Sequence, residues 1–585
     1  MTETKNGKTP EELLAEEVTQ DFLKRQEERR LTERGWQLNM NFVSGNQYCD
    51  VNASGEIFEE EKGYYWQSRR VFNHVASIVD LRCSKLGRIR PALIVRAAGT
   101  DEADRHSAAI ASAVLSARAE DIDAAVCDAT VWSEICGTAF YKVTWDGSAG
   151  EPVGADGDKR LNQGDVKISA LSPFEIYPYS LSIESLEAQP SIIHAKAAAV
   201  QDIYSAYGVR LEGNDDGYEL VIERYERPTE ERRQGRLTIV AGGVLLYDGA
   251  LPYLNGDGGG RIYPFVKQLA LPRAGAFFGT SVVDRLIPLQ RAYNAVKNRK
   301  HEFLNRISMG TVAVEDGSVD TDELAEDGLT PGKIIVYRQG GRPPEMLTLG
   351  SVPSEFAAEE ENLVKEFSKV SGTGDITDNA DGFAGVTSAT GLQLIMEQDE
   401  ERMEFSCQQI KRALKSVGRQ TLRLYRQFAS DVRLVKIVNS EDALSLFYFK
   451  GSDIASDDVS LATDSEANTS PAQRRTFIYD VLDRGLLNDA DGKLGVSAKN
   501  KVLELLGFKA LAGGRDLGEL HRSRAGRENM RLRAQDVEVK SYDDHDTHVA
   551  EHTAFLLSEE ISPETEKRIC AHIDMHKKLK EAANG

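Results

Sequence analysis

Apolar side chains recur at a helical spacing over residues 389–430, a stretch without proline. The apolar positions are Met403, Ile410, Leu414, Val417, Tyr425 and Phe428. This period predicts one amphipathic α-helix, which at about 1.5 Å per residue would be roughly 60 Å long. Acidic residues crowd its first half and basic residues its second half, the order that a helix macrodipole favours. Enzymes seldom need a rod of this length, whereas large ring assemblies do.

The segments before this helix show first helical and then β-type sequence patterns. The helical period predicts amphipathic helices over residues 10–43 and 71–87, and one or two alanine-rich helices over 102–136. Short β-type runs separated by glycine and aspartate turns then follow, at residues 140–145, 166–170, 220–225, 237–240 and 244–247. The glycine-rich residues 255–260 are predicted to be a mobile hairpin tip. The fold class is therefore predicted to be α+β, with antiparallel strands.

Two helices of opposite charge flank a small β insertion. Residues 280–307 predict a helix that Pro288 should either kink or start, with six basic against two acidic side chains. Residues 353–371 predict a second helix, with five glutamates against two lysines. The insertion between them has β-type runs at 311–314 and 333–337 and eight acidic against three basic residues. The pattern indicates an antiparallel pair whose polar faces meet each other or a neighbouring subunit, although a simple helical hairpin would give the same pattern.

A loop rich in glycine and aspartate precedes the long helix. Residues 372–388 contain four glycines together with Asp375, Asp378 and Asp381. Because glycine widens the accessible backbone conformations, we expect a flexible acidic loop. An ordinary surface linker would have the same composition.

Composition separates the chain from several classes of protein. Its 585 residues predict three to five structural units, and its 41 % hydrophobic and 28 % charged content is that of a soluble protein. We expect neither a membrane span nor a signal peptide. The six cysteines form no CxxC pair, so we expect reduced thiols. A net charge of −22 argues against a protein that binds nucleic acid tightly by neutralising phosphates. The same negative charge would suit a protein that lets DNA slide past its surface.

Motifs for catalysis are nearly absent from the sequence. The approximations to a phosphate loop (328–334), a calcium loop (489–492) and a zincin helix (301–305) each lack a required residue, so we expect neither enzymatic activity nor a cofactor. A metal site is suggested only by three histidines that share one helix face, His545, His548 and His552. We prefer polar contact between neighbouring helices as the explanation, because the sequence shows no further ligand or base.

The order of these elements resembles the core of tailed-bacteriophage portal proteins of the short-tailed-phage type. That family has a stem helix, a clip, a second stem helix, a tunnel loop and a long wing helix in succession. Local motifs over about residues 30–510 are similar too: Trp36 with Gly45–Tyr48, Arg70–Asn73, Pro91 with Asp101 and Asp104, Gly137–Tyr141, Ser172–Glu175, Phe278–Ser281 with Asp284, Pro288–Gln290, Tyr293–Asn294 and Ala389–Gly391.

The resemblance implies a multi-domain α+β subunit that forms a ring. Its parts would be an N-terminal wing region (1–279), stem helix 1 (280–307), the clip (308–352), stem helix 2 (353–371), the tunnel loop (372–388), the long wing helix (389–430), a C-terminal wing region (431–500) and a helical crown (501–585). The tunnel loop would present Asp375, Asp378 and Asp381 to a DNA channel. The stem would add weak DNA contacts from Arg291, Lys297, Arg299, Lys300 and Arg306.

The resemblance also implies a function. Such subunits form a dodecameric ring at one capsid vertex of the virion, after assembly in the host cytoplasm, and double-stranded DNA passes through it without sequence recognition during packaging and ejection. The expected partners are further copies of the chain, the terminase large subunit, head–tail adaptor and tail proteins, and the major capsid and scaffolding proteins, with no membrane. Two alternatives stay open: a non-viral structural ring or scaffold, and a metal-dependent enzyme that uses the C-terminal histidines.

Overall fold

Two compact units make up the chain. The first comprises Met1–Ile437 and Leu446–Ala467, and the second comprises Val438–Ser445 and Asn468–Gly585. The computed structural model describes residues 8–52, 54–61, 69–87, 92–99, 102–156, 159–211, 217–256, 259–309, 311–322, 334–347, 352–372, 389–438, 444–461, 478–485, 499, 502, 517–532, 535–558 and 563–584. The six cysteines all lie within these ranges and are free thiols, as their spacing predicted.

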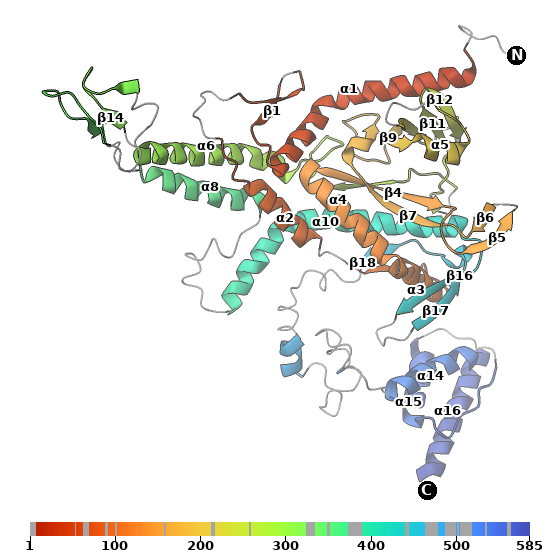
Figure 1. The fold of residues 1–585 in the computed structure, drawn as a ribbon. Coiled ribbons are helices and arrows are strands. Elements are labelled where there is room, and N and C mark those ends of the chain that lie inside the picture. Colours follow the sequence, from red (N-terminus) through yellow and green to blue (C-terminus); the bar gives the residue numbers. More distant parts are fainter. Residues whose placement is uncertain are drawn as a thin grey trace. The chain divides into compact units, whose positions relative to one another are not determined.

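Apart from α5, which the sequence analysis did not predict, the helices of the first unit lie close to where the apolar period predicts them (Figure 1). They are α1 (Pro10–Ser44), α2 (His74–Leu86), α3 (Glu102–Ala117), α4 (Ala119–Cys136), α5 (Val200–Tyr207), α6 (Val282–Met309), α8 (Glu355–Ser371) and α10 (Ala389–Phe428). The start of α1 is fixed by a capping box, in which the Thr9 side chain accepts the N–H of Glu12 at 3.3 Å and the Glu12 carboxylate accepts the N–H of Thr9 at 2.8 Å.

Antiparallel sheets account for most strands of the first unit, so the predicted α+β class with antiparallel pairing is confirmed for the described residues. A five-stranded sheet has the order β12-β11-β10-β9-β8, and a three-stranded sheet has the order β13-β4-β7. These strands are β4 (Thr138–Asp146), β7 (Asp165–Leu171), β8 (Ile176–Pro178), β9 (Ser191–Ala199), β10 (Tyr218–Glu226), β11 (Arg236–Ala241), β12 (Val244–Gly249) and β13 (Phe265–Leu269).

Short strands complete the first unit. The paired ones are β1 (Cys49–Val51) with β2 (Ile57–Glu59), β3 (Leu93–Val95) with β18 (Val459–Leu461), β5 (Pro152–Asp156) with β6 (Lys159–Asn162), and β14 (Thr311–Ala313) with β15 (Glu345–Leu347). After α10 come β16 (Arg433–Val438) and β17 (Leu444–Phe449). The expected hairpin tip at 255–260 is closed by an antiparallel bridge between Leu254 and Arg261.

The long helix α10 packs along the three-stranded sheet (Figure 1). Five of the six apolar positions that predicted this helix are buried, and Phe428 is partly buried. All of them except Met403 join a core that also includes Tyr141, Val143 and Val166 from the sheet. The helix therefore supports the sheet through most of its described length.

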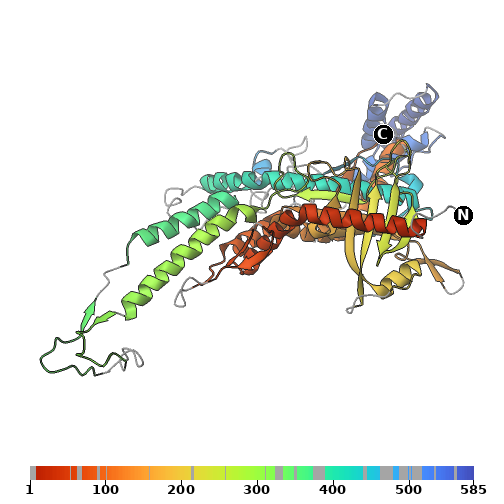
Figure 2. The same cartoon turned by 90° about the horizontal axis from the view of Figure 1, so that it is seen from above.

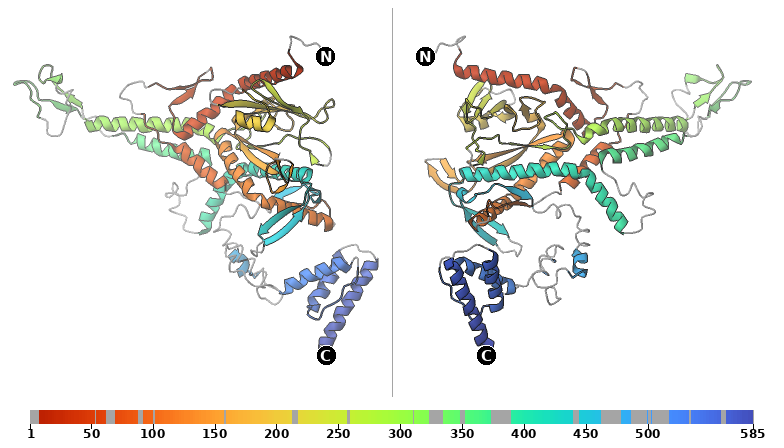
Figure 3. Two further views of the ribbon diagram at one scale, coloured as in Figure 1. Left: turned by 45° about the vertical axis from the view of Figure 1, so that its right-hand side comes forward. Right: turned by 180° about the vertical axis from the view of Figure 1, so that it is seen from behind.

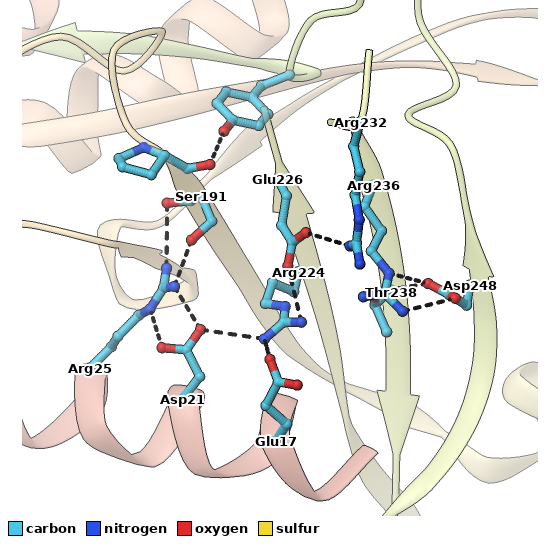
Figure 4. A network of polar contacts seen from close by, with 12 residues as sticks. Glu17, Asp21, Arg25, Ser191, Arg224, Glu226, Arg232, Arg236, Thr238 and Asp248 are labelled. Carbon is cyan, nitrogen blue, oxygen red and sulfur yellow. Dashed lines mark hydrogen bonds and ion pairs between the residues drawn. The ribbon is translucent and has the colours of Figure 1, made fainter. Parts of the chain in front are cut away.

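Charged side chains, not only apolar ones, dock α1 on the five-stranded sheet (Figure 4). Arg25 is buried, with Nη2 donating to Ser191 Oγ at 2.7 Å and to Asp21 Oδ2 at 2.6 Å. Arg224 of β10 reaches back to Glu17 of α1 at 2.8 Å. The guanidinium groups thus satisfy polar groups of the sheet that an apolar side chain would leave unpaired.

A second buried arginine of α1 holds the turn before β8. Arg29 is 1 % exposed and its Nη1 donates to the carbonyl oxygens of Pro173 at 2.8 Å and Ile176 at 2.5 Å. Its guanidinium also lies 3.7 Å from the ring centre of Tyr177. Burial lowers the pKa of Arg29. The turn it holds contains the Ser172–Glu175 motif, which gives this motif a structural reason.

Two glycines far apart in the sequence meet where α4 ends. Gly137 has φ +82° after α4, and a Cβ there would lie 2.7 Å from the carbonyl oxygen of Gly279. A Cβ on Gly279 would lie equally close to the carbonyl oxygen of Gly137. Because neither position has room for a side chain, the motifs Gly137–Tyr141 and Phe278–Ser281 are two halves of one backbone crossing.

Three long helices lie in the C-terminal part of the second unit (Figure 3). They are α14 (Leu517–Leu532), α15 (His545–Ser558) and α16 (Pro563–Asn584). Leu532, Phe555, Ile569 and Ile573 form a small apolar core among them. Within the described part of the whole chain, no helix combines the length and the apolar content that a membrane span requires.

Candidate functional site

The helices α6 and α8 lie side by side in the first unit (Figures 1 and 2). Lys300 Nζ contacts Glu360 Oε2 at 2.8 Å, and Lys297 contacts the other oxygen of the same carboxylate. Burial works against the charged form of Glu360, but hydrogen bonds from both lysines outweigh it and lower its pKa. The opposite charges therefore pair within one subunit. Pro288 lies inside α6, so the idea that it starts the regular helix is wrong.

The basic residues expected on the stem have different surroundings. Lys297 and Lys300 are held by Glu360, and Arg291 Nη1 lies 3.1 Å from Asp50 Oδ2 while its Nη2 donates to the carbonyl oxygen of Cys49 at 2.9 Å. Arg299 is exposed and lines a groove with Tyr48, Glu60 and Arg69 among others. The side chain of Arg306 lies outside the described residues. Only Arg299 among the described four thus combines high exposure with an open groove.

The insertion between these helices, residues 308–352, carries the hairpin β14–β15. The run 311–314 contains β14 as predicted, but the predicted strand at 333–337 is wrong, since its described residues 334–337 have no regular structure. The strand that pairs with β14 is Glu345–Leu347. The apolar run is instead highly exposed, with Ile334 at 85 % and Val336 at 81 %. Its β-branched composition is typical of a strand, but no strand among the described residues pairs with it.

The loop with Asp375, Asp378 and Asp381 lies outside the described residues, but the residues before it and the helix after it are tied together. Arg82 of α2 forms a buried ion pair with Glu134 of α4, at 2.6 Å between Nε and Oε2. Its Nη1 donates to the carbonyl oxygen of Ser371 at 2.6 Å, and Nη2 lies 3.5 Å from Ser406 Oγ of α10. One guanidinium therefore fixes the end of α8 against α2, α4 and α10.

Amide side chains one turn apart on α6 bind an extended segment of the N-terminal region. Gln290 Oε1 accepts the N–H of His74 at 3.0 Å, and its Nε2 donates to the carbonyl oxygen of Phe72 at 2.7 Å. Asn294 Oδ1 accepts the N–H of Phe72 at 3.1 Å, and its Nδ2 donates to Gln47 Oε1 at 2.7 Å. We call Gln290, Asn294 and Asn298 the amide ladder. These contacts bring together the motifs around Gln47, Phe72 and α6.

The third rung of the amide ladder continues the pattern. Asn298 Oδ1 accepts the N–H of Arg70 at 3.0 Å, while its Nδ2 donates to the Arg70 carbonyl oxygen at 2.9 Å and to the Tyr48 hydroxyl at 2.7 Å. Burial raises the pKa of Tyr48, so its hydroxyl keeps its proton. Side chains of α6 thus form the hydrogen bonds to the backbone of Arg70 and Phe72 that a neighbouring strand would otherwise supply.

Replacing Asn294 with leucine should lower the free energy of unfolding of the first unit by about 2–3 kcal/mol, since the buried Gln47 amide and the Phe72 N–H lose their partners. Chemical denaturation measures this change. Asn305, exposed on the same helix, supplies the matched control, and N305L should be close to neutral. Equal effects of the two substitutions would show that the amide ladder adds nothing beyond helix propensity.

The predicted histidine face lies on α15 of the second unit. His548 and His552 are fully buried there, and His545 Nδ1 lies 2.9 Å from His576 Nδ1 of α16. Burial lowers the pKa of His548, that of His552 to about 3 and that of His576 to about 4. The predicted contact between neighbouring helices therefore exists, and it is made largely by histidines.

Sequence reasoning missed several residues that the structure brings together. His572 and His576 are spaced by one helical turn on α16, and that spacing was the available signal for their joining the face of α15. Glu528, Arg82 and Asn298 carry no such signal, because a buried polar residue looks like an exposed one in the sequence. Their partners are distant in the chain.

Comparison with known proteins adds one match. Residues 195–470 match a family model described as phage P22-like portal protein. This region begins within β9 and contains α6, the β14–β15 hairpin, α8 and α10. A search of curated proteins finds no match.

Proposed function

Because the chain belongs to the P22-like portal protein family through its residues 195–470, we propose that it forms a dodecameric ring at one capsid vertex of a tailed bacteriophage. Double-stranded DNA would pass through this ring during packaging and ejection. The observation that carries the proposal is the coincidence of the family match with the succession of α6, the β14–β15 hairpin, α8 and α10.

Exposed apolar side chains support the oligomeric part of the proposal. On the insertion, Ile334, Val336 and Met346 are 85, 81 and 59 % exposed. Leu304 of α6 and Phe405 of α10 are also exposed. Large exposed apolar groups in one region mark an interaction surface. In a ring, the same surface of every subunit meets a second surface of its neighbour, so the contact is heterologous and closes on itself.

Charge supports a channel that does not hold DNA tightly. The chain carries a net charge of −22. Three basic residues of α6, Arg291, Lys297 and Lys300, are each paired with a carboxylate of the same subunit. Few cations then stay available to neutralise phosphates, the interaction that dominates non-specific DNA binding. Twelve loops with Asp375, Asp378 and Asp381 would make the narrowest part of the channel repulsive as well.

The partners follow from the same proposal. The acidic insertion at 308–352 is the segment that we assign to docking of the terminase large subunit, and head–tail adaptor proteins would take its place after packaging. The major capsid and scaffolding proteins would surround the ring during assembly in the host cytoplasm. DNA would pass without sequence recognition, and the role would be structural instead of enzymatic.

The purified protein should sediment mainly as a species twelve times heavier than its 64.5 kDa subunit, and negative-stain images should show rings with a central hole. Analytical ultracentrifugation over a range of protein concentrations and ionic strengths measures the mass. A 64.5 kDa species alone under all these conditions would contradict the proposal. A ring without a hole wide enough for duplex DNA would favour the structural scaffold that is the first alternative.

A metal-dependent enzyme is the second alternative. Its candidate site on α15 is enclosed, since His548 and His552 are both 0 % exposed. A catalytic metal needs an open coordination position that substrate can reach. The enclosure therefore favours a structural role for these histidines.

A further inference from the structure

Histidines replace apolar residues in the interior of the second unit. Six of the ten histidines of the chain lie on α14–α16: His521, His545, His548, His552, His572 and His576. The last four are each 0 % exposed, and Glu528 of α14 is 4 % exposed beside them. We call Glu528, His548, His552, His572 and His576 the histidine cluster. Burying so many polar rings is costly unless each finds a partner.

The side-chain atoms of the histidine cluster converge on one carboxylate oxygen. Glu528 Oε2 lies 3.1 Å from His548 Nδ1, 3.6 Å from His572 Nε2 and 3.9 Å from His552 Nε2. His576 Nε2 lies 3.2 Å from His572 Nε2. Ligand atoms around a tetrahedral Zn²⁺ with bonds of 2.0–2.1 Å are about 3.3 Å apart. The observed separations bracket this value.

Hydrogen bonds on the outer side of the rings turn the inner nitrogens toward the carboxylate. His552 Nδ1 lies 2.6 Å from Asn529 Oδ1, and His572 Nδ1 lies 3.0 Å from the carbonyl oxygen of Val537. An oxygen acceptor requires the proton on Nδ1, which leaves the lone pair on Nε2. Metal-binding histidines are oriented in this way by carbonyl and carboxylate acceptors.

Glu528 is oriented by the same means. Its Oε1 accepts a hydrogen bond from Arg524 Nε at 3.1 Å, while its Oε2 makes no hydrogen bond within the described part of the chain. Among the described residues, His552 Nε2 and both ring nitrogens of His548 are also buried without a hydrogen bond. One potential ligand atom from each of Glu528, His548, His552 and His576 lies within 4.8 Å of the others.

We propose that the histidine cluster binds one divalent transition-metal ion, with Glu528 and three of the four histidines as ligands. Imidazole with one carboxylate suits Zn²⁺. Each ligand is enclosed, so the site is structural and stabilises the packing of α14, α15 and α16. Because the apolar core of Leu532, Phe555, Ile569 and Ile573 is small, a metal ion that links the three helices would add stability that this core alone does not supply. This site is independent of the portal role.

The full-length protein without an affinity tag should bind one Zn²⁺ per subunit. After removal of bound metal with a chelator, added Co²⁺ should give the visible absorption of a tetrahedral complex. Elemental analysis and calorimetry measure the metal content and the unfolding temperature, which should fall with the chelator and recover with Zn²⁺. No bound Zn²⁺ or Co²⁺ at micromolar metal, together with an unfolding temperature that the chelator does not change, would overturn the proposal in favour of polar helix packing alone.

Variants locate the metal. H552Q and E528Q should each weaken Zn²⁺ binding at least tenfold, whereas H106Q, at an exposed histidine of the first unit, should leave it unchanged. Equal weakening by H106Q would indicate adventitious surface binding and overturn the proposal.

Asn529 tests the orientation of the site without touching the metal. N529L removes the acceptor for His552 Nδ1 and should weaken Zn²⁺ binding ten- to a hundredfold. N529D keeps an acceptor oxygen and should restore most of the affinity. If N529L destabilises the protein but binds Zn²⁺ as the unaltered chain does, His552 is not a ligand and this assignment is wrong.

Discussion

Replacing Arg82 with leucine should lower the free energy of unfolding of the first unit by about 3–5 kcal/mol, among the largest effects expected from one substitution in this unit. Glu134, 1 % exposed, would keep a buried carboxylate without its cation. The carbonyl oxygen of Ser371 would lose the donor that lies 2.6 Å away. Breaking one partner of a buried ion pair is more costly than the pair's net contribution, because the other charge stays desolvated.

A double-mutant cycle distinguishes this cause from a loss of packing. If the unpaired Glu134 carboxylate causes the loss of stability, the double variant R82L/E134L should be more stable than R82L alone, because it lacks both charges. Arg105 is exposed on α3, so R105L is the matched control and should be nearly neutral. Hydrogen exchange should also accelerate in the last turn of α8 in R82L. A double variant as unstable as R82L would show that the methylene and guanidinium packing of Arg82 matters more than its charge.

Apolar periodicity predicted the helices well because the buried side of each long helix is mainly apolar. In α10, the spacing of Ile410, Leu414 and Val417 is enough to place the buried face. The same reasoning fails where polar groups form the interior. Arg25 and Arg29 continue the buried face of α1, but a sequence pattern reads them as solvent-exposed. Many of their acceptors are backbone carbonyl groups, which have no sequence signature.

The misplaced strand of the insertion has a related cause. Residues 334–337 are rich in β-branched side chains, which favour a pleated surface, yet the described residues of the subunit supply no strand that pairs with them. Ile334 and Val336 are accordingly exposed.

The histidine cluster was predictable only in part, because the spacing of the histidines on α15 is visible in the sequence. Its completion by Glu528 and by α16 depends on how three helices pack.

Changing Asp375, Asp378 and Asp381 to lysine should convert a repulsive channel into one that retains DNA. Three carboxylates become three ammonium groups, so the net charge of each subunit, −22 in the unaltered chain, becomes more positive by six units. Repeated around a ring, these cations would contact phosphates at the narrowest point. Retention of DNA at low salt should rise roughly tenfold or more and fall again steeply as salt is added, because counterion release sets the affinity. Packaging or release of the genome should slow accordingly.

The controls separate the position of the charge from its amount. The triple change of Asp202, Glu230 and Glu231 to lysine alters the net charge equally at exposed sites of α5 and the β10–β11 connection, and it should leave packaging intact. Changing the three loop aspartates to asparagine removes repulsion without adding attraction, so it should fall between the lysine variant and the unaltered protein. Electron microscopy should show normal rings in all three variants. If the loop lysines leave both DNA retention at low salt and packaging unchanged, residues 372–388 lie away from the channel and serve as a linker between α8 and α10.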